Sequence, residues 1–134
     1  MELKENHDKG ESLVREGAQK ITEKDIEKVV AKSDEIQRKF YSRGPLSRFV
    51  DDGRLLIALV RDYWARNYRR VPFGIIGAAV FTLIYVLNPL DLVPDILPII
   101  GQVDDATVVG ACLLMIERDL LAYKTWRAGP PDSD

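Results

Sequence analysis

The longest stretch without a basic residue limits what this chain can fold into. Between Val71 and Ile116 there is no lysine or arginine, and the fifteen residues from Phe73 to Leu87 carry no charge. A helix that is apolar on every side must be buried in protein or in lipid. We therefore expect a central hydrophobic helix over 73–87 that is covered by the rest of the chain or by a membrane.

The sequence around this segment is typical of helices, because apolar residues recur at helical spacing and no β-hairpin signature is present. Thr22 and Asp25 have the spacing of a capping box and mark the start of one amphipathic helix. The predicted fold class is all-α, a small bundle of about four helices around a hydrophobic helical hairpin. The four predicted helices cover residues 23–42, 47–69, 73–87 and 105–123, and the hairpin consists of the last two.

A length of 134 residues suits one domain with some additional charged sequence. Residues 1–20 are polar with weak periodicity, so we expect a frayed tail or a short marginal helix there. The predicted organisation is a polar tail over 1–21, an amphipathic helix and linker over 22–45, a helical domain over 46–127 and a C-terminal tail over 128–134.

Composition excludes several classes of protein. The 19 basic and 21 acidic residues give a net charge of −2, so no overall attraction to nucleic acid is expected. The single cysteine, Cys112, excludes an internal disulfide and a multi-cysteine zinc site, and we interpret it as part of the core. The charged N-terminus lacks the apolar run of a secretory signal. The expected location is the cytoplasmic side of an inner membrane or endomembrane, or otherwise the cytoplasm.

The segment after the apolar helix is rich in proline and aspartate. Three prolines prevent continuous helix there, so an ordered apolar turn is predicted, with Asn88, Pro89, Asp91, Pro94 and Asp95 as its structural motif.

The run Pro-Leu-Asp-Leu-Val-Pro-Asp at 89–95, with the downstream pair Asp104–Asp105 and the basic 68–70, resembles the YkvA-like domain-of-unknown-function family. The resemblance covers about residues 68–112. It implies a small helical domain, often associated with membranes, that occurs in bacteria and in larger proteins elsewhere. It implies no established reaction.

Four carboxylates, Asp91, Asp95, Asp104 and Asp105, lie inside otherwise apolar sequence and could meet at one end of the hairpin. One interpretation is structural, with the aspartates bonding to turn backbone, to an arginine, or to the start of the last helix as its cap. The other is a site for calcium or magnesium, since these cations prefer oxygen ligands. No cofactor is expected.

Aromatic and basic residues alternate just before the apolar helix, which is typical of a surface for nucleic acid or for anionic lipid. The position immediately before the apolar helix favours lipid. Trp64, Arg66, Arg69 and Arg70 are the predicted contacts. Basic residues on both flanks of the hairpin, Arg61 before it and Arg127 after it among them, fit the positive-inside tendency. The alternative is that these are ordinary helix ends. A simple two-pass topology is doubtful, because the returning segment is short and contains Asp104–Asp105.

Catalysis is not expected, because the only histidine, His7, lies in the predicted tail, away from any nucleophile. The predicted function is a non-enzymatic membrane-associated adaptor or scaffold module whose apolar hairpin engages membrane lipid or a membrane protein. The alternative is a soluble helical protein-interaction domain, with or without a cation site at the aspartates. A homo-oligomer fits either function.

Overall fold

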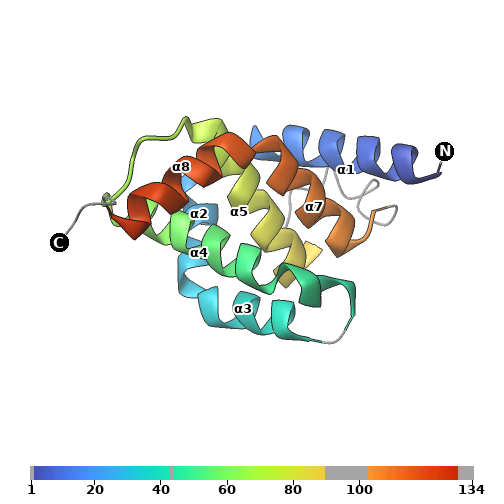
Figure 1. The fold of residues 1–134 in the computed structure, drawn as a ribbon, viewed down its shortest axis with the longest axis horizontal. Helices are drawn as coiled ribbons and strands as arrows, with labels where there is room; N and C mark the ends of the chain where they lie inside the picture. The colour runs from blue at the N-terminus through green and yellow to red at the C-terminus, as the bar shows by residue number, and fades with distance from the viewer. Residues whose placement is uncertain (1, 43, 90–102, 130–134) are drawn as a thin grey trace.

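The computed structural model describes residues 2–42, 44–89 and 103–129, and within these ranges all regular secondary structure is helical (Figure 1). The predicted all-α fold class is confirmed. The elements are α1 (Glu2–Ala18), α2 (Glu23–Ala31), α3 (Ser33–Tyr41), the 3-10 helix η1 (Pro45–Phe49), α4 (Val50–Trp64), α5 (Phe73–Leu87), α7 (Asp105–Met115) and α8 (Glu117–Ala128).

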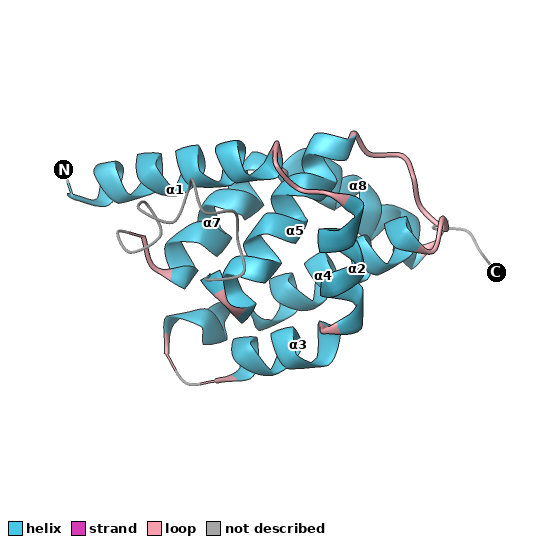
Figure 2. Ribbon diagram, turned by 180° about the vertical axis from the view of Figure 1, so that it is seen from behind, coloured by secondary structure: helices cyan, strands magenta, loops and turns pink. Residues whose placement is uncertain are grey.

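The apolar helix α5 is the centre of the fold and packs against α1, α2, α3, α4 and α7 (Figures 1 and 2). Every residue from Ile76 to Val86 is buried. Burying one large aliphatic or aromatic side chain contributes about 1.5–3 kcal/mol, so covering α5 is the main source of stability. The apolar helix was expected to be buried either by the rest of the chain or by a membrane, and in this structure the other helices of the chain bury it.

Among the described residues, none of the helices has both the length and the apolar character needed to cross a bilayer.

The N-terminal segment is not the frayed tail or marginal helix expected for residues 1–20. It forms α1, which lies along α5 and α7, and its Leu13 and Val14 are completely buried. The contact is close because Gly17 and Gly77 have no side chains at the crossing with α5. A Cβ added at Gly77 would lie 2.4 Å from the carbonyl oxygen of Ala18. The apolar periodicity of this segment is weak because the buried face of α1 includes glycine residues, which do not appear as hydrophobic positions in the sequence pattern.

Two predicted helices are each divided in two, and α1 is an additional one, so the described residues contain seven α-helices where about four were predicted. The predicted helix over 23–42 is interrupted at Lys32, and the last predicted helix at Ile116. Both residues still donate a backbone bond to the carbonyl four positions earlier, Lys32 at 2.9 Å and Ile116 at 3.0 Å. The apolar periodicity therefore continues across each interruption, so the sequence pattern did not indicate where the helix divides. The capping box is present, with the Thr22 N–H donating to the Asp25 carboxylate at 2.9 Å.

The predicted hairpin pair, α5 and α7, is in direct contact. The Tyr85 hydroxyl donates to the Val103 carbonyl at 2.5 Å and ties the end of α5 to the chain before α7. Cys112 of α7 is fully buried, and its Sγ lies 3.6 Å from the Ala78 carbonyl of α5. Burial raises the pKa of this thiol to about 12, so it is an inert core residue as interpreted from the sequence.

Candidate functional site

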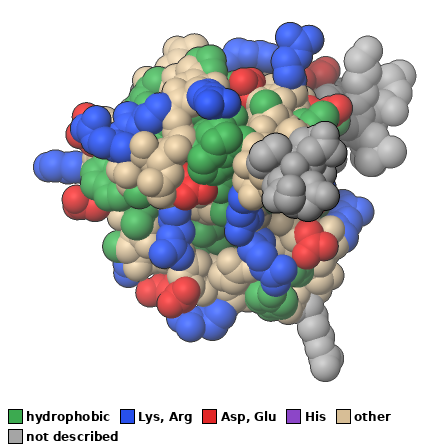
Figure 3. Space-filling view, turned by 60° about the vertical axis from the view of Figure 1, so that its left-hand side comes forward, with side chains coloured by type: hydrophobic (Ala, Val, Ile, Leu, Met, Phe, Trp, Pro, Cys, Tyr) green, Lys and Arg blue, Asp and Glu red, His purple; other side chains and the backbone are tan. Residues whose placement is uncertain are grey.

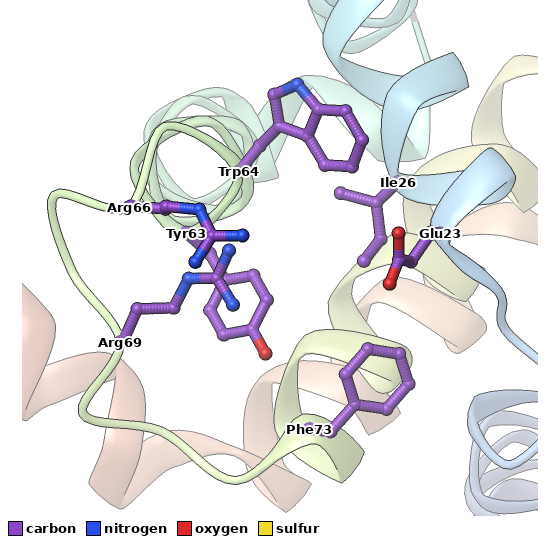
Figure 4. Close-up of a pocket in the computed structure, with 7 residues that line it drawn as sticks. All are labelled: Glu23, Ile26, Tyr63, Trp64, Arg66, Arg69 and Phe73. Atoms are coloured by element: carbon purple, nitrogen blue, oxygen red, sulfur yellow. The ribbon is translucent and has the colours of Figure 1, made fainter.

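A cavity of about 420 Å³ lies where the end of α4, the connection to α5 and the start of α2 meet (Figure 4). Its walls are aromatic, basic and aliphatic, and one carboxylate faces it. The lining residues are Tyr63 and Trp64 from α4, Arg66 and Arg69 from the connection, Phe73 from α5, and Glu23 and Ile26 from α2. We call it the aromatic–arginine cavity.

The end of α4 fixes the position of Arg66. The Asn67 N–H donates to the Asp62 carbonyl at 2.9 Å and the Arg66 N–H to the Tyr63 carbonyl at 3.1 Å, which is the bonding pattern of a Schellman motif. The motif requires a left-handed residue, usually glycine, and here Arg66 takes that conformation with φ 67°. A side chain in this conformation costs about 1–2 kcal/mol. The left-handed backbone conformation of Arg66 is therefore strained, and backbone strain of this kind is often found at functional sites.

The connection after α4 is held by a second set of contacts. The Asp62 carboxylate accepts hydrogen bonds from the Tyr123 hydroxyl at 2.5 Å and the Asn67 amide at 3.3 Å. The rings of Tyr68, Tyr123 and Trp126 pack together, with centroids 4.8–5.9 Å apart. Burial and the Asp62 carboxylate raise the pKa of Tyr123 well above its ordinary value. This cluster attaches α8 to the segment that carries the two arginines.

The two arginines of the cavity converge. The Arg69 guanidinium carbon lies 4.1 Å from the centroid of the Tyr63 ring, a cation–π contact. Figure 4 shows the Arg66 and Arg69 guanidinium groups side by side next to that ring, with Glu23 facing them across the cavity. Within the described residues, neither arginine has a carboxylate within ion-pair distance. Two adjacent cations that no carboxylate of the described residues neutralises make a site for an anion.

The structure brings together three of the four residues predicted to contact lipid or a partner: Trp64, Arg66 and Arg69. Arg70 is exposed in the same connection but does not line the cavity. Glu23 and Ile26 were not predicted, because they lie about forty residues earlier in the chain and no local pattern links them to this segment. Phe73, which is 44% exposed at the start of α5, could have been noticed as an aromatic next to the basic stretch.

Of the four aspartates, Asp104 and Asp105 are described. Asp104 caps α7, because its carboxylate accepts from the Thr107 N–H at 2.8 Å, as the structural interpretation expected. Partial burial and the neighbouring Asp104 raise the pKa of Asp105, and the charge of Lys39 offsets part of this rise. Within the described ranges, no group of three potential ligand side chains is placed to hold a metal ion.

The rest of the motif lies partly outside the described residues. Asp91, Pro94 and Asp95 are beyond them, so their predicted roles in the turn and in cation binding stay predictions. Asn88 follows α5 and donates its N–H to the Ile84 carbonyl at 2.8 Å.

The end of the molecule with the α4–α5 connection carries many cations. Figure 3, in which this end comes forward, shows lysine and arginine side chains distributed around exposed hydrophobic ones. Such a mixture suits an anionic surface with an apolar layer beneath it.

Comparison with known proteins adds two findings. Residues 75–111 match the family described as "Protein of unknown function (DUF1232)". The chain is also 30% identical over 69 residues to the "Uncharacterized membrane protein YkvA" of Bacillus subtilis (strain 168); this match covers 52% of the chain and 65% of that relative's length. No solved structure matches the chain. The family match covers most of α5 and α7, and all seven residues that line the aromatic–arginine cavity are outside it.

Proposed function

Because this chain belongs to the YkvA-like family of DUF1232 domains, we propose that it is a non-enzymatic, membrane-associated adaptor or scaffold module that docks on anionic lipid through the aromatic–arginine cavity. The observation that carries the proposal is the convergence of Arg66 and Arg69 beside Tyr63. We place the module at the cytoplasmic side of a membrane, where anionic lipids attract basic segments.

The cavity suits an amphiphilic anion. Guanidinium groups bind phosphate oxygens through forked hydrogen bonds, and two of them next to each other fit one lipid phosphate. Phe73 and Trp64 provide an apolar wall next to these cations, and aromatic side chains favour the membrane interface. Since α5 is covered by its neighbours, docking through this surface needs no exposure of the apolar helix. The name of the Bacillus relative, a membrane protein, is consistent with this proposal.

The chemistry of the cavity favours binding over catalysis. Its seven lining residues include no serine, threonine, cysteine or histidine. Nucleophilic catalysis of the serine, threonine or cysteine type therefore has no nucleophile among them. We therefore assign the cavity a binding role.

Sedimentation with vesicles tests the proposal. We expect the protein to bind vesicles of phosphatidylcholine with phosphatidylglycerol, and to bind pure phosphatidylcholine weakly. Removing a basic residue near an anionic surface costs about 1 kcal/mol, so Arg66→Gln and Arg69→Gln are each expected to weaken partition about fivefold.

Arg70→Gln is the matched control, because it removes the same charge from the same connection outside the cavity. It is expected to have a smaller effect than either cavity variant. Equal effects of all three substitutions would mean diffuse charge attraction without a site, and no effect of any would refute the proposal. In a Trp126→Phe background, Trp64 is the remaining tryptophan, and its emission is expected to shift to shorter wavelength on docking.

A soluble protein-interaction domain is the second candidate function, and one observation favours it. Leu114 of α7 and Leu121 of α8 are 60% and 62% exposed. Exposed large apolar side chains are typical of interfaces when they form one patch. Light scattering coupled to size exclusion tests self-association: a dimer that Leu114→Ser with Leu121→Ser converts to a monomer would support this function.

A further inference from the structure

A second cavity, of about 370 Å³, lies between α3, α4 and α8 and is separate from the aromatic–arginine cavity. Three arginines line it. Arg54 and Arg61 come from α4 and Arg127 from the last turn of α8, and Gln37 of α3 completes the polar wall. We call it the triple-arginine cavity.

The helix geometry explains how the arginines meet. Positions seven apart lie on the same face of an α-helix, so Arg54 and Arg61 are two turns apart above one strip of α4. Ala58 lies between them and also lines the cavity, and its small side chain leaves space below the two guanidinium groups. The packing of α8 against α4 adds Arg127 from the side. Three cations are thus gathered from two helices that are far apart in sequence.

The single carboxylate in this cavity is already engaged. Asp62 lines it, but its two oxygens accept hydrogen bonds from the Tyr123 hydroxyl at 2.5 Å and the Asn67 amide at 3.3 Å. Arg54 donates to the Tyr41 hydroxyl, and its guanidinium carbon lies 5.9 Å from the centroid of the Tyr41 ring; both contacts are neutral and leave its charge uncompensated. In the part of the chain that the structure describes, Arg61 and Arg127 form no ion pair, and the carboxylate paired with Arg54 is that of Asp51, at 3.7 Å and 97% exposed. Such an exposed pair holds an arginine weakly. The cavity therefore has a formal excess of two positive charges.

We propose that the triple-arginine cavity binds the dianionic head of a phosphomonoester through Arg54, Arg61 and Arg127. The charge of such a group near neutral pH, about −1.5 to −2, matches the excess in the cavity. Its three terminal oxygens suit three guanidinium forks, which bind phosphate in a bidentate manner. Gln37 lines the same cavity, and an amide can bond to the ester oxygen or to a neighbouring hydroxyl. The inference goes beyond the proposed function, because it concerns other residues and another ligand group.

Inorganic phosphate is the first probe, with the full chain observed by NMR at the arginine Nε–Hε groups. We expect saturable shifts of the Arg54, Arg61 and Arg127 signals at a pH where phosphate is dianionic, measured at constant ionic strength against chloride. Arg61→Gln with Arg127→Gln is expected to weaken this binding about tenfold or more. The matched control is Arg38→Gln with Arg118→Gln, two exposed arginines of α3 and α8 outside the cavity, which are expected to leave it unchanged.

Two further probes distinguish the source of the phosphomonoester. Tighter binding to vesicles with phosphatidic acid than to vesicles with phosphatidylglycerol at matched charge, lost in the Arg61/Arg127 variant, would support a lipid head group. Saturable binding of glycerol 3-phosphate without that lipid preference would support a free ligand. The absence of saturable shifts at millimolar phosphate, or equal binding by the Arg61/Arg127 variant and its control, would overturn the inference. The Arg66 and Arg69 variants are expected to keep phosphate binding, so failure of the proposed function and failure of this inference are separate results.

Discussion

Replacing Gly77 by alanine is expected to force α1 away from α5. The added Cβ would lie 2.4 Å from the Ala18 carbonyl oxygen and 3.2 Å from its carbonyl carbon. Both atoms belong to the backbone of α1, so relief requires a shift of the whole helix by most of an ångström. A shift of that size disturbs the packing of Leu13 and Val14, which are buried on the same helix.

Gly74 supplies a matched control on the same helix. A Cβ added there meets no heavy atom within 4 Å, so Gly74→Ala changes helix propensity without overpacking. Alanine in place of glycine inside a helix favours folding by about 1 kcal/mol, and overpacking a core costs about 1–3 kcal/mol. Gly74→Ala should therefore be up to about 1 kcal/mol more stable than the wild type. Gly77→Ala should have a free energy of unfolding about 1–3 kcal/mol below that of Gly74→Ala.

Urea unfolding followed by far-ultraviolet circular dichroism measures this difference, and thermal unfolding provides a second estimate. For a chain of this size, 1 kcal/mol corresponds to about 3–5 °C in Tm. Equal stability of the two variants would refute the reasoning. It would mean that α1 does not touch α5 at Gly77, and that the N-terminal segment is the tail that its periodicity suggested.

Three further predictions follow from the contacts around α4 and α5. Arg66→Gly relieves the left-handed strain, so it is expected to raise the free energy of unfolding by about 1 kcal/mol while weakening vesicle binding; lower stability would show that the arginine side chain supports the fold. Tyr123→Phe removes the hydrogen bond to the Asp62 carboxylate and is expected to cost about 1.5–3 kcal/mol in urea unfolding at pH 7; a cost near zero would contradict this bond. Burial raises the pKa of Tyr85 to about 12 and that of Tyr123 further, whereas an unfolded tyrosine ionises near 10. The stability from these protonated phenols is therefore complete below pH 10 and is lost as pH rises toward 12. The urea midpoint at pH 11 should be lower than at pH 9, and Tyr85→Phe should reduce that difference.

The sequence was sufficient to predict the elements whose signal is local. An uncharged run of helical length has few alternatives, so α5 was predicted with the bounds that the structure shows, Phe73–Leu87. The capping box at Thr22 is equally local and was also correct. The burial of α1 was not predictable in this way, because its contact with α5 depends on the absence of side chains at Gly17 and Gly77.

Only the part of the candidate site that comes from the end of α4 and the connection after it could be predicted from the sequence. Trp64, Arg66 and Arg69 lie within six residues, and their alternation of ring and charge is visible in the sequence. Glu23 and Ile26 reach the same cavity only because α2 packs against α4, a tertiary contact without a local signature. The triple-arginine cavity was missed for the same reason, since Arg61 and Arg127 are 66 positions apart. In the sequence these two arginines flank the apolar hairpin and were interpreted as a sign of membrane orientation. In the folded chain they line one cavity.

The buried thiol between α5 and α7 allows the separation of these two helices to be followed by the rate of cysteine labelling. Cys112 is the single cysteine of the chain, so any alkylation by a maleimide reports one event, the separation of these two helices. If the module rests on lipid through its surface arginines, adding vesicles should leave the labelling rate unchanged or slow it. If the membrane draws the apolar hairpin out of the bundle, the same addition should speed labelling. The unmodified chain can therefore tell surface docking from insertion by the rate at which one sulfur atom reacts.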